Sequence, residues 1–124
     1  MQTTTPTTSY DKPFPALTAA QRFHLDVNGY VVIQNTLTPD EVGRTREALQ
    51  KLKRDLIATG DPDNAVVRGA RFSLYKAHHV HFAHIVEADP AILEYMVNPR
   101  LVAMAEEFVG GNVRLEESEA IINS

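Results

Sequence analysis

The chain has 124 residues, no cysteine and a formal net charge of −4, which limits it to one domain or to a part of one. The lack of cysteine excludes disulfides and thiolate metal sites, and no secretory signal is recognisable, so we expect a cytoplasmic protein. The negative charge argues against nucleic-acid and membrane surfaces, because both attract clustered lysine and arginine. No apolar run approaches the roughly 20 residues that span a bilayer.

Residues 1–16 are rich in threonine and proline. This composition offers too little apolar surface to fold, so we predict a disordered tail. No internal repeat and no linker interrupts the remainder, and we assign residues 17–124 to one folded region.

The first folded segment combines a helix, a glycine break and a strand. Thr18 and Gln21 have the spacing of a capping box, which predicts a helix over about residues 19–27. Gly29 then allows a backbone conformation that other residues resist. The aromatic and β-branched run that follows predicts a buried strand over about residues 30–34.

The second helix is predicted over residues 39–57. Thr38 and Glu41 form a capping box around Pro39, which suits the first helical position, and Gly60 ends the helix. Apolar steps of three and four residues define its inner face. The residues of this face are Val42, Thr45, Leu49, Leu52 and Leu56.

Shorter elements are expected in the second half of the chain. Patterning predicts strands over residues 65–67 and 71–75, a helix over 78–87, and two helices that begin at Pro90 and Pro99. A final strand is predicted from Asn112, with Val113 and Leu115 on one face, and it runs into the apolar residues 120–122. An uncovered apolar strand requires a partner, which another chain or the rest of a larger protein would supply.

Four segments together resemble the N-terminal part of the phytanoyl-CoA dioxygenase family of Fe(II)/2-oxoglutarate-dependent oxygenases. They are LDVNGYVVI at residues 25–33, LTPDEV at 37–42, NPRL at 98–101 and FVGGNV at 108–113. The resemblance implies an α+β fold, in which a helical flank and the first strands belong to a double-stranded β-helix, or jelly roll. Because all-β barrels run to roughly 200–250 residues, we expect this chain to hold only the front part of that fold.

The family resemblance also implies Fe(II) and 2-oxoglutarate as cofactors and hydroxylation of a small or acyl organic substrate. The family holds its iron with a His-x-Asp pair and a distant histidine, and the resemblance places these ligands beyond the Ile121–Ile122 strand. We therefore assign no catalytic residue and no metal ligand, and expect neither cofactor to bind this chain alone. The alternative is a non-catalytic interaction module that self-associates or pairs its C-terminal strand with a partner.

His24 and Asp26 also form a His-x-Asp sequence. An iron chelate needs both side chains on one face, which a strand provides because its side chains alternate with a period of two. On the predicted helix, residues two apart diverge by roughly 200°, so we do not assign an iron site here.

Four further histidines cluster at His78, His79, His81 and His84. On the predicted helix three of them, spaced by three residues, share a face and could bind zinc or nickel. The alternative is an ordinary surface segment with Phe82 and Ile85 packed inward, because the spacing matches no tight metal motif.

Lys76 is the one candidate cofactor contact in the chain. It follows the predicted strand over residues 71–75, where the family resemblance places a basic residue that faces 2-oxoglutarate. A cationic side chain suits a dicarboxylate. The alternative is a solvated lysine at a strand end.

Overall fold

The computed structural model describes residues 16–124, which divide into two compact units. Unit 1 comprises residues 16–36 and Val97–Arg114, and unit 2 comprises Leu37–Met96 and Leu115–Ser124. The predicted tail lies outside the described residues except for Ala16.

Unit 1 contains two helices, α1 (Ala19–Asn28) and α4 (Pro99–Val109). The predicted capping box of α1 is confirmed, since Thr18 and Gln21 exchange side-chain and backbone hydrogen bonds. Gly29 ends α1 with φ 79°, in the left-handed region that glycine tolerates. The helix predicted from Pro99 is likewise present, and it ends at Gly110.

Two long-range hydrogen bonds hold α4 to the first segment of unit 1. The buried Leu17 donates its backbone N–H to Glu107 Oε2 at 3.1 Å. Arg100 Nε donates to the backbone carbonyl of Thr36 at 3.0 Å. Both bonds satisfy backbone groups in segments without regular structure.

The strand predicted over residues 30–34 is wrong. Residues 30–33 have no regular structure, and a turn follows at residues 34–35. Tyr30 and Val32 are exposed. A strand forms only where a neighbour completes its hydrogen bonds, and no described strand lies beside this segment.

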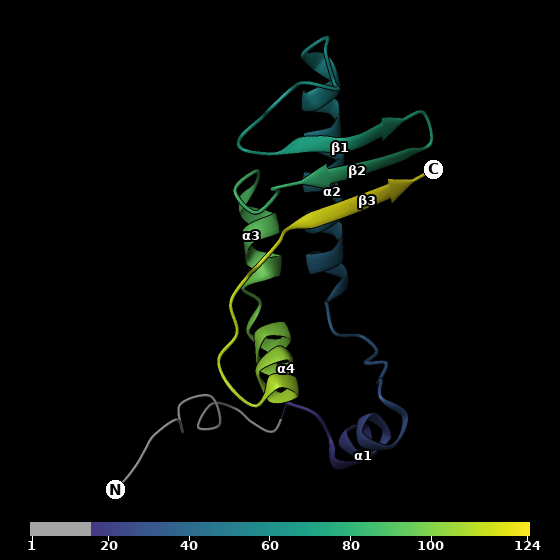
Figure 1. Cartoon of the computed structure of the whole chain (residues 1–124), viewed down its shortest axis with the longest axis vertical. Coiled ribbons are helices and arrows are strands. Elements are labelled where there is room, and N and C mark those ends of the chain that lie inside the picture. Colours follow the sequence, from purple (N-terminus) through teal and green to yellow (C-terminus); the bar gives the residue numbers. More distant parts are fainter. Residues whose placement is uncertain (1–15) are drawn as a thin grey trace, which may run out of the picture. The chain divides into compact units, whose positions relative to one another are not determined.

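Unit 2 is a small antiparallel sheet packed on helices (Figure 1). Its helices are α2 (Pro39–Ala58) and α3 (Pro90–Met96). Its strands are β1 (Arg71–Lys76), β2 (His79–Ala83) and β3 (Glu119–Asn123), in the order β1-β2-β3. The helices predicted from Pro39 and Pro90 are therefore confirmed, and the general class is α+β.

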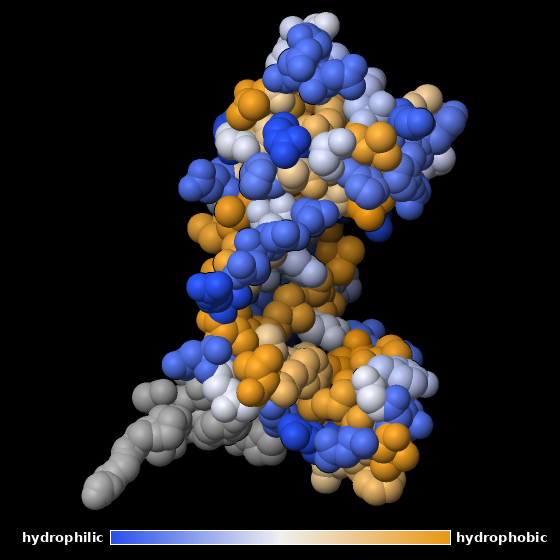
Figure 2. Space-filling model, in the orientation of Figure 1, coloured by the Kyte–Doolittle hydropathy of each residue, from blue (hydrophilic) through white to orange (hydrophobic). Residues whose placement is uncertain are grey.

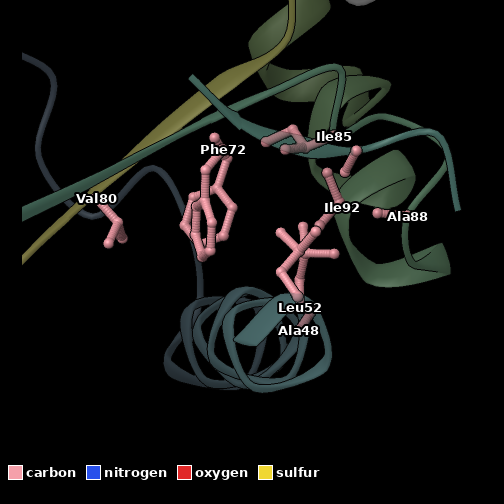
Figure 3. Close-up of a cluster of buried hydrophobic side chains, with 10 residues drawn as sticks. Ala48, Leu52, Phe72, Val80, Ile85, Ala88 and Ile92 are labelled. Atoms are coloured by element: carbon pink, nitrogen blue, oxygen red, sulfur yellow. The ribbon is translucent and has the colours of Figure 1, made fainter. Parts of the chain in front are cut away.

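The core of unit 2 lies between one face of the sheet and the two helices. Figure 3 shows Phe72 from β1 directed toward Leu52 and Ala48 of α2, with Ile92 of α3 beside them. The buried apolar residues are Ala48, Leu52, Leu56, Ala70, Phe72, Val80, Phe82, Ile85, Ala88 and Ile92. Burial of these side chains is the main stabilising term, at roughly 1.5–3 kcal/mol for each large one.

A β-bulge changes the pattern of β1. Phe72 pairs with Phe82 and Leu74 pairs with His81, so Ser73 is an extra residue without a partner. Phe72 and Tyr75 therefore point to the core, whereas Ser73 and Leu74 are exposed. A bulge bends and twists its strand locally.

Three further predictions of secondary structure are corrected. Residues 78–87 contain β2 and turns rather than a helix. Residues 65–67 contribute only an isolated bridge, in which Val67 pairs with Ala70 across a tight turn. The final strand begins at Glu119 and not at Asn112, because β2 offers partners only from Glu119 onward.

Ser118 joins the start of β3 to the end of β2. Its backbone carbonyl accepts from His84 N–H at 2.9 Å. Its hydroxyl oxygen accepts from the backbone N–H groups of Ile85 at 3.1 Å and Val86 at 3.3 Å. One buried serine thus satisfies three backbone donors where the chain leaves the sheet.

Among the described residues, none of the helices combines the length and apolar character needed to span a bilayer. The longest helix, α2, carries charged residues along its exposed side.

Candidate functional site: the open face of the sheet

The face of the sheet opposite the core is not covered by any helix of unit 2, and we call it the open face. Side-chain alternation and the bulge at Ser73 define its members. They are Arg71, Ser73, Leu74, Lys76, His79, His81, Ala83, Glu119, Ile121 and Asn123. Figure 2 shows hydrophilic residues predominating over the strands of unit 2, with apolar residues among them.

Cross-strand pairing arranges these side chains in rows. The central row is Leu74, His81 and Ile121, and the row toward the hairpin turn is Lys76, His79 and Asn123. Directly opposite residues lie about 4.5–5.5 Å apart at their Cβ atoms. The open face therefore places a lysine and two histidines side by side.

The two histidines of β2 are in direct contact. The ring centroids of His79 and His81 are 4.7 Å apart, with an angle of 51° between the ring planes. His79 Nδ1 is hydrogen-bonded to Asn123 Oδ1 on β3. Both side chains are only partly exposed, so strand geometry and neighbours fix their positions.

The predicted grouping of His78, His81 and His84 on one helical face is wrong, because the segment is not helical. His78 lies in the two-residue turn between β1 and β2, and His81 is on the strand. His84 follows β2 with φ 58°, which turns the chain away from the strand direction. The structure instead brings His79 and His81 together.

Lys76 lies at the end of β1, opposite His79. It is exposed and has no ion-pair or hydrogen-bond partner among residues 16–124. Its ammonium group is thus available to an anion at the open face, as the predicted contact with 2-oxoglutarate requires.

A hollow of about 640 Å³ lies at the other end of the sheet, within unit 2. Its charged lining is mainly acidic, consisting of Glu87, Glu116, Glu117 and Glu119 against Arg71 and His84. The four glutamate carboxylates would repel the two carboxylates of a dicarboxylate ligand, because the charges are alike. The hollow therefore does not suit 2-oxoglutarate, and Lys76 does not line it.

His24 and Asp26 lie on α1, in agreement with the helix predicted there. Asp26 pairs with Arg22 at 3.3 Å. His24 Nδ1 is 3.2 Å from Asn28 Nδ2, and its ring makes an edge contact with Tyr30. Each residue has its own local partner, and the two do not form a chelate.

An iron facial triad does not fit the described residues. Such a site needs two histidines and one carboxylate around a single point. Within residues 16–124, no three histidine or acidic side chains are grouped closely enough to hold a metal ion.

Two ion pairs of unit 2 shift pKa values away from the open face. The hydrogen bond from Arg68, supported by Lys51, holds the pKa of Asp55 below its ordinary value. The hydrogen bond that Arg44 donates to Glu94 raises the pKa of the Arg44 guanidinium. The first pair anchors the loop before β1, and the second joins α2 to α3.

Sequence reasoning missed the pairing of His79 with His81, although a signal was present. From His79 to Phe82 polar and apolar residues alternate with a period of two, as in a half-buried strand. Over so short a segment, the spacing of three residues between His78, His81 and His84 matches a helix equally well.

Searches against protein-family models, curated proteins and solved structures found no match to this chain. The resemblance to dioxygenases therefore stays a prediction from sequence.

Proposed function

We propose that this chain forms the helical flank and first strands of a cytoplasmic Fe(II)/2-oxoglutarate-dependent oxygenase of the phytanoyl-CoA dioxygenase type. The complete enzyme would hydroxylate a small or acyl organic substrate. The order of the four family-like segments over residues 17–124 supports this proposal. The structural observation that carries it is a sheet with helices on one face and an open face on the other.

A jelly roll consists of two antiparallel sheets packed face to face. Helices outside one sheet would correspond to α2 and α3, and the second sheet would cover the open face. Leu74 and Ile121 on that face are 36% and 53% exposed, respectively. Packing of a second sheet would remove these apolar side chains from water.

Within this proposal Lys76 contacts a carboxylate of 2-oxoglutarate. It projects from the open face, which becomes the interior of a closed jelly roll, and it has no competing partner among the described residues. The iron would be held by residues outside the described set, since the side chains present do not fit that metal. We therefore assign no reaction step to the residues of this chain.

The direct test of the proposal is the coding DNA that follows the Ser124 codon, translated in all frames. We expect a His-x-Asp sequence and a distant histidine. A stop codon with neither element in any frame contradicts the proposal.

The 124-residue chain itself is tested by anaerobic Fe(II) titration and a succinate-release assay in air. We expect no stoichiometric iron binding and no turnover. Iron-dependent succinate release that is lost in His24→Ala or His81→Ala would show that this chain contains its own iron site.

Lys76 is tested in the extended enzyme. Loss of a charged hydrogen bond is worth about 1.5–3 kcal/mol, so Lys76→Ala should raise the KM for 2-oxoglutarate roughly tenfold or more. The neighbouring turn variant His78→Ala should leave that KM unchanged. Equal KM values in the wild type and Lys76→Ala would remove the residue from the cofactor site.

A second candidate function is self-association through β3, and the two edges of the sheet favour it. The β1 edge carries a bulge and the charged residues Arg71 and Lys76, which discourage strand addition. The β3 edge is a regular strand with Ile121 exposed, and no described strand covers its outer side. The free edge is therefore the one suited to strand pairing.

The hydrogen-bond pattern defines how two copies would pair. Ser118 and Ser124 bond to β2, so every second residue between them also faces β2. The backbone groups of Glu119, Ile121 and Asn123 consequently face outward. Antiparallel pairing about Ile121 would place Glu119 opposite Asn123 of the second copy, so that the amide group can donate to the carboxylate.

Light scattering coupled to size exclusion tests this pairing. Ile121→Pro removes an outward N–H without removing a bond to β2, and it should convert a dimer to a monomer. Ile121→Val keeps the N–H and should remain dimeric. A monomeric wild-type protein at high micromolar concentration contradicts self-association.

A further inference from the structure

His79 and His81 have the placement that a two-imidazole chelate requires. They are two residues apart on β2, so their side chains leave the same face of the sheet. Their ring centroids are already 4.7 Å apart. Two imidazoles placed this close on one face of a strand can each present one nitrogen to a common ion.

The contact with Asn123 selects one tautomer of the His79 ring. An amide oxygen only accepts hydrogen bonds, so the contact with Asn123 Oδ1 places the proton on His79 Nδ1. The lone pair then remains on Nε2, the nitrogen farther from Asn123. An oriented imidazole whose other nitrogen donates to a protein oxygen is the usual arrangement of histidine metal ligands.

The residues around the pair keep it ordered and accessible. Leu74 and Ile121 flank His81 across the strands and restrict its ring. Lys76 lies opposite His79, and its positive charge repels a metal cation bound there. The ammonium group is on a long flexible side chain, however, and can extend into water. The lysine thus weakens cation binding without blocking it.

We propose that His79 and His81 chelate one divalent transition-metal ion, with Asn123 as a positioning residue. Neutral imidazoles favour zinc, nickel and copper, and the Irving–Williams order places copper(II) as the tightest of the three. Two protein ligands leave the remaining positions to water or to another molecule. This site is distinct from an oxygenase iron centre and does not depend on the proposed function.

The test is isothermal titration of the tag-free 124-residue chain with Cu²⁺, Ni²⁺ or Zn²⁺ alone, in a buffer that does not bind metals. We expect one equivalent of each ion, with Cu²⁺ bound most tightly. His79→Ala and His81→Ala should each abolish this binding. The matched variants His78→Ala and His84→Ala should keep wild-type affinity.

Two further variants separate the roles of the neighbours. Asn123→Ala should weaken binding roughly tenfold through loss of ring orientation. Lys76→Ala should strengthen binding, because it removes a like charge. Far-UV circular dichroism of the metal-free variants verifies folding. We expect the fold to persist, because Lys76, His79, His81 and Asn123 all lie on the open face and not in the core.

A measurement without mutation completes the test. The chain has five histidines, and Cu²⁺ should broaden the imidazole proton NMR signals of His79 and His81 before those of the other three. Uniform broadening, or equal loss of affinity in all four histidine variants, would indicate non-specific binding and overturn the proposal. Wild-type affinity in both His79→Ala and His81→Ala would overturn it as well.

Discussion

Ser118→Ala tests the tie between the start of β3 and the end of β2. Ser118 is 7% exposed, and its hydroxyl accepts from the backbone N–H of Ile85, which is 2% exposed. Alanine fits the same space but leaves that donor without an acceptor. The half-buried Val86 also loses a bond, but water can replace the hydroxyl there.

The magnitude follows from these two donors. A buried donor without a partner costs about 1–3 kcal/mol, and a donor that water can reach costs far less. We therefore expect Ser118→Ala to lower the free energy of unfolding by about 2 kcal/mol. In a unit of this size each kcal/mol shifts the Tm by about 4–8 °C, so the Tm should fall by roughly 10 °C.

The assay is urea unfolding followed by far-UV circular dichroism, with thermal melts in parallel. The slope of free energy against urea should stay constant, because the surface exposed on unfolding is unchanged. Ser73→Ala is the matched control, since Ser73 is exposed in the bulge, and it should change stability by less than about 0.5 kcal/mol. Equal effects of the two substitutions would refute the role of the buried hydroxyl.

Backbone conformation and charge give two further predictions. A Cβ atom at Gly43 or Gly60 meets nothing within 4 Å, but Gly60 has φ 85°. Gly43→Ala, inside α2, should raise the free energy of unfolding by about 0.5–1 kcal/mol, whereas Gly60→Ala should lower it by about 1–2 kcal/mol. Urea unfolding measures both changes. Changes of the same sign in the two variants would contradict this prediction. The hydrogen bond from Arg68 lowers the pKa of Asp55 in the folded state. The ion pair therefore stabilises the fold fully at pH values above the pKa of an unfolded aspartate, about 3.9. This stabilisation is lost as the pH falls through the lower pKa of the folded state. Asp55→Asn should therefore lower the Tm at pH 7 but not near pH 2, and the exposed control Asp63→Asn should show no such pH-dependent difference.

The helices could be predicted from sequence because their signals are local. The capping boxes at Thr18 and Thr38 and the proline at Pro99 each act within four residues of the helix start. The predicted inner face of α2 is largely confirmed at Leu52 and Leu56, which are fully buried, whereas Val42 is exposed. Local hydrogen bonds therefore fix where a helix begins, and tertiary packing decides how much of its apolar side is covered.

The strands were harder to predict because their partners are distant in the sequence. Tyr30 and its β-branched neighbours favour extended backbone, but they have no adjacent strand in the described structure and remain a loop. The segment that contains β2 also matches a helix, because His78, His81 and His84 are spaced by three residues. Strand formation depends on pairing, which a single-sequence pattern does not contain.

The candidate site depends on the same non-local information. Lys76 was selected from the sequence, and the structure places it on the open face. The contact of His79 with Asn123 joins residues 44 positions apart. No spacing rule links two such residues, because only the register of β2 against β3 brings them together.

The long separation between β2 and β3 also affects folding during synthesis. β1 and β2 are joined by a two-residue turn and can pair within microseconds of leaving the ribosome. The bond from Ile85 to Ser118 spans 33 positions, which at typical rates takes roughly 2–7 s to translate. For those seconds the β2 edge is open, and a chaperone or a neighbouring nascent chain has time to reach it before β3 does.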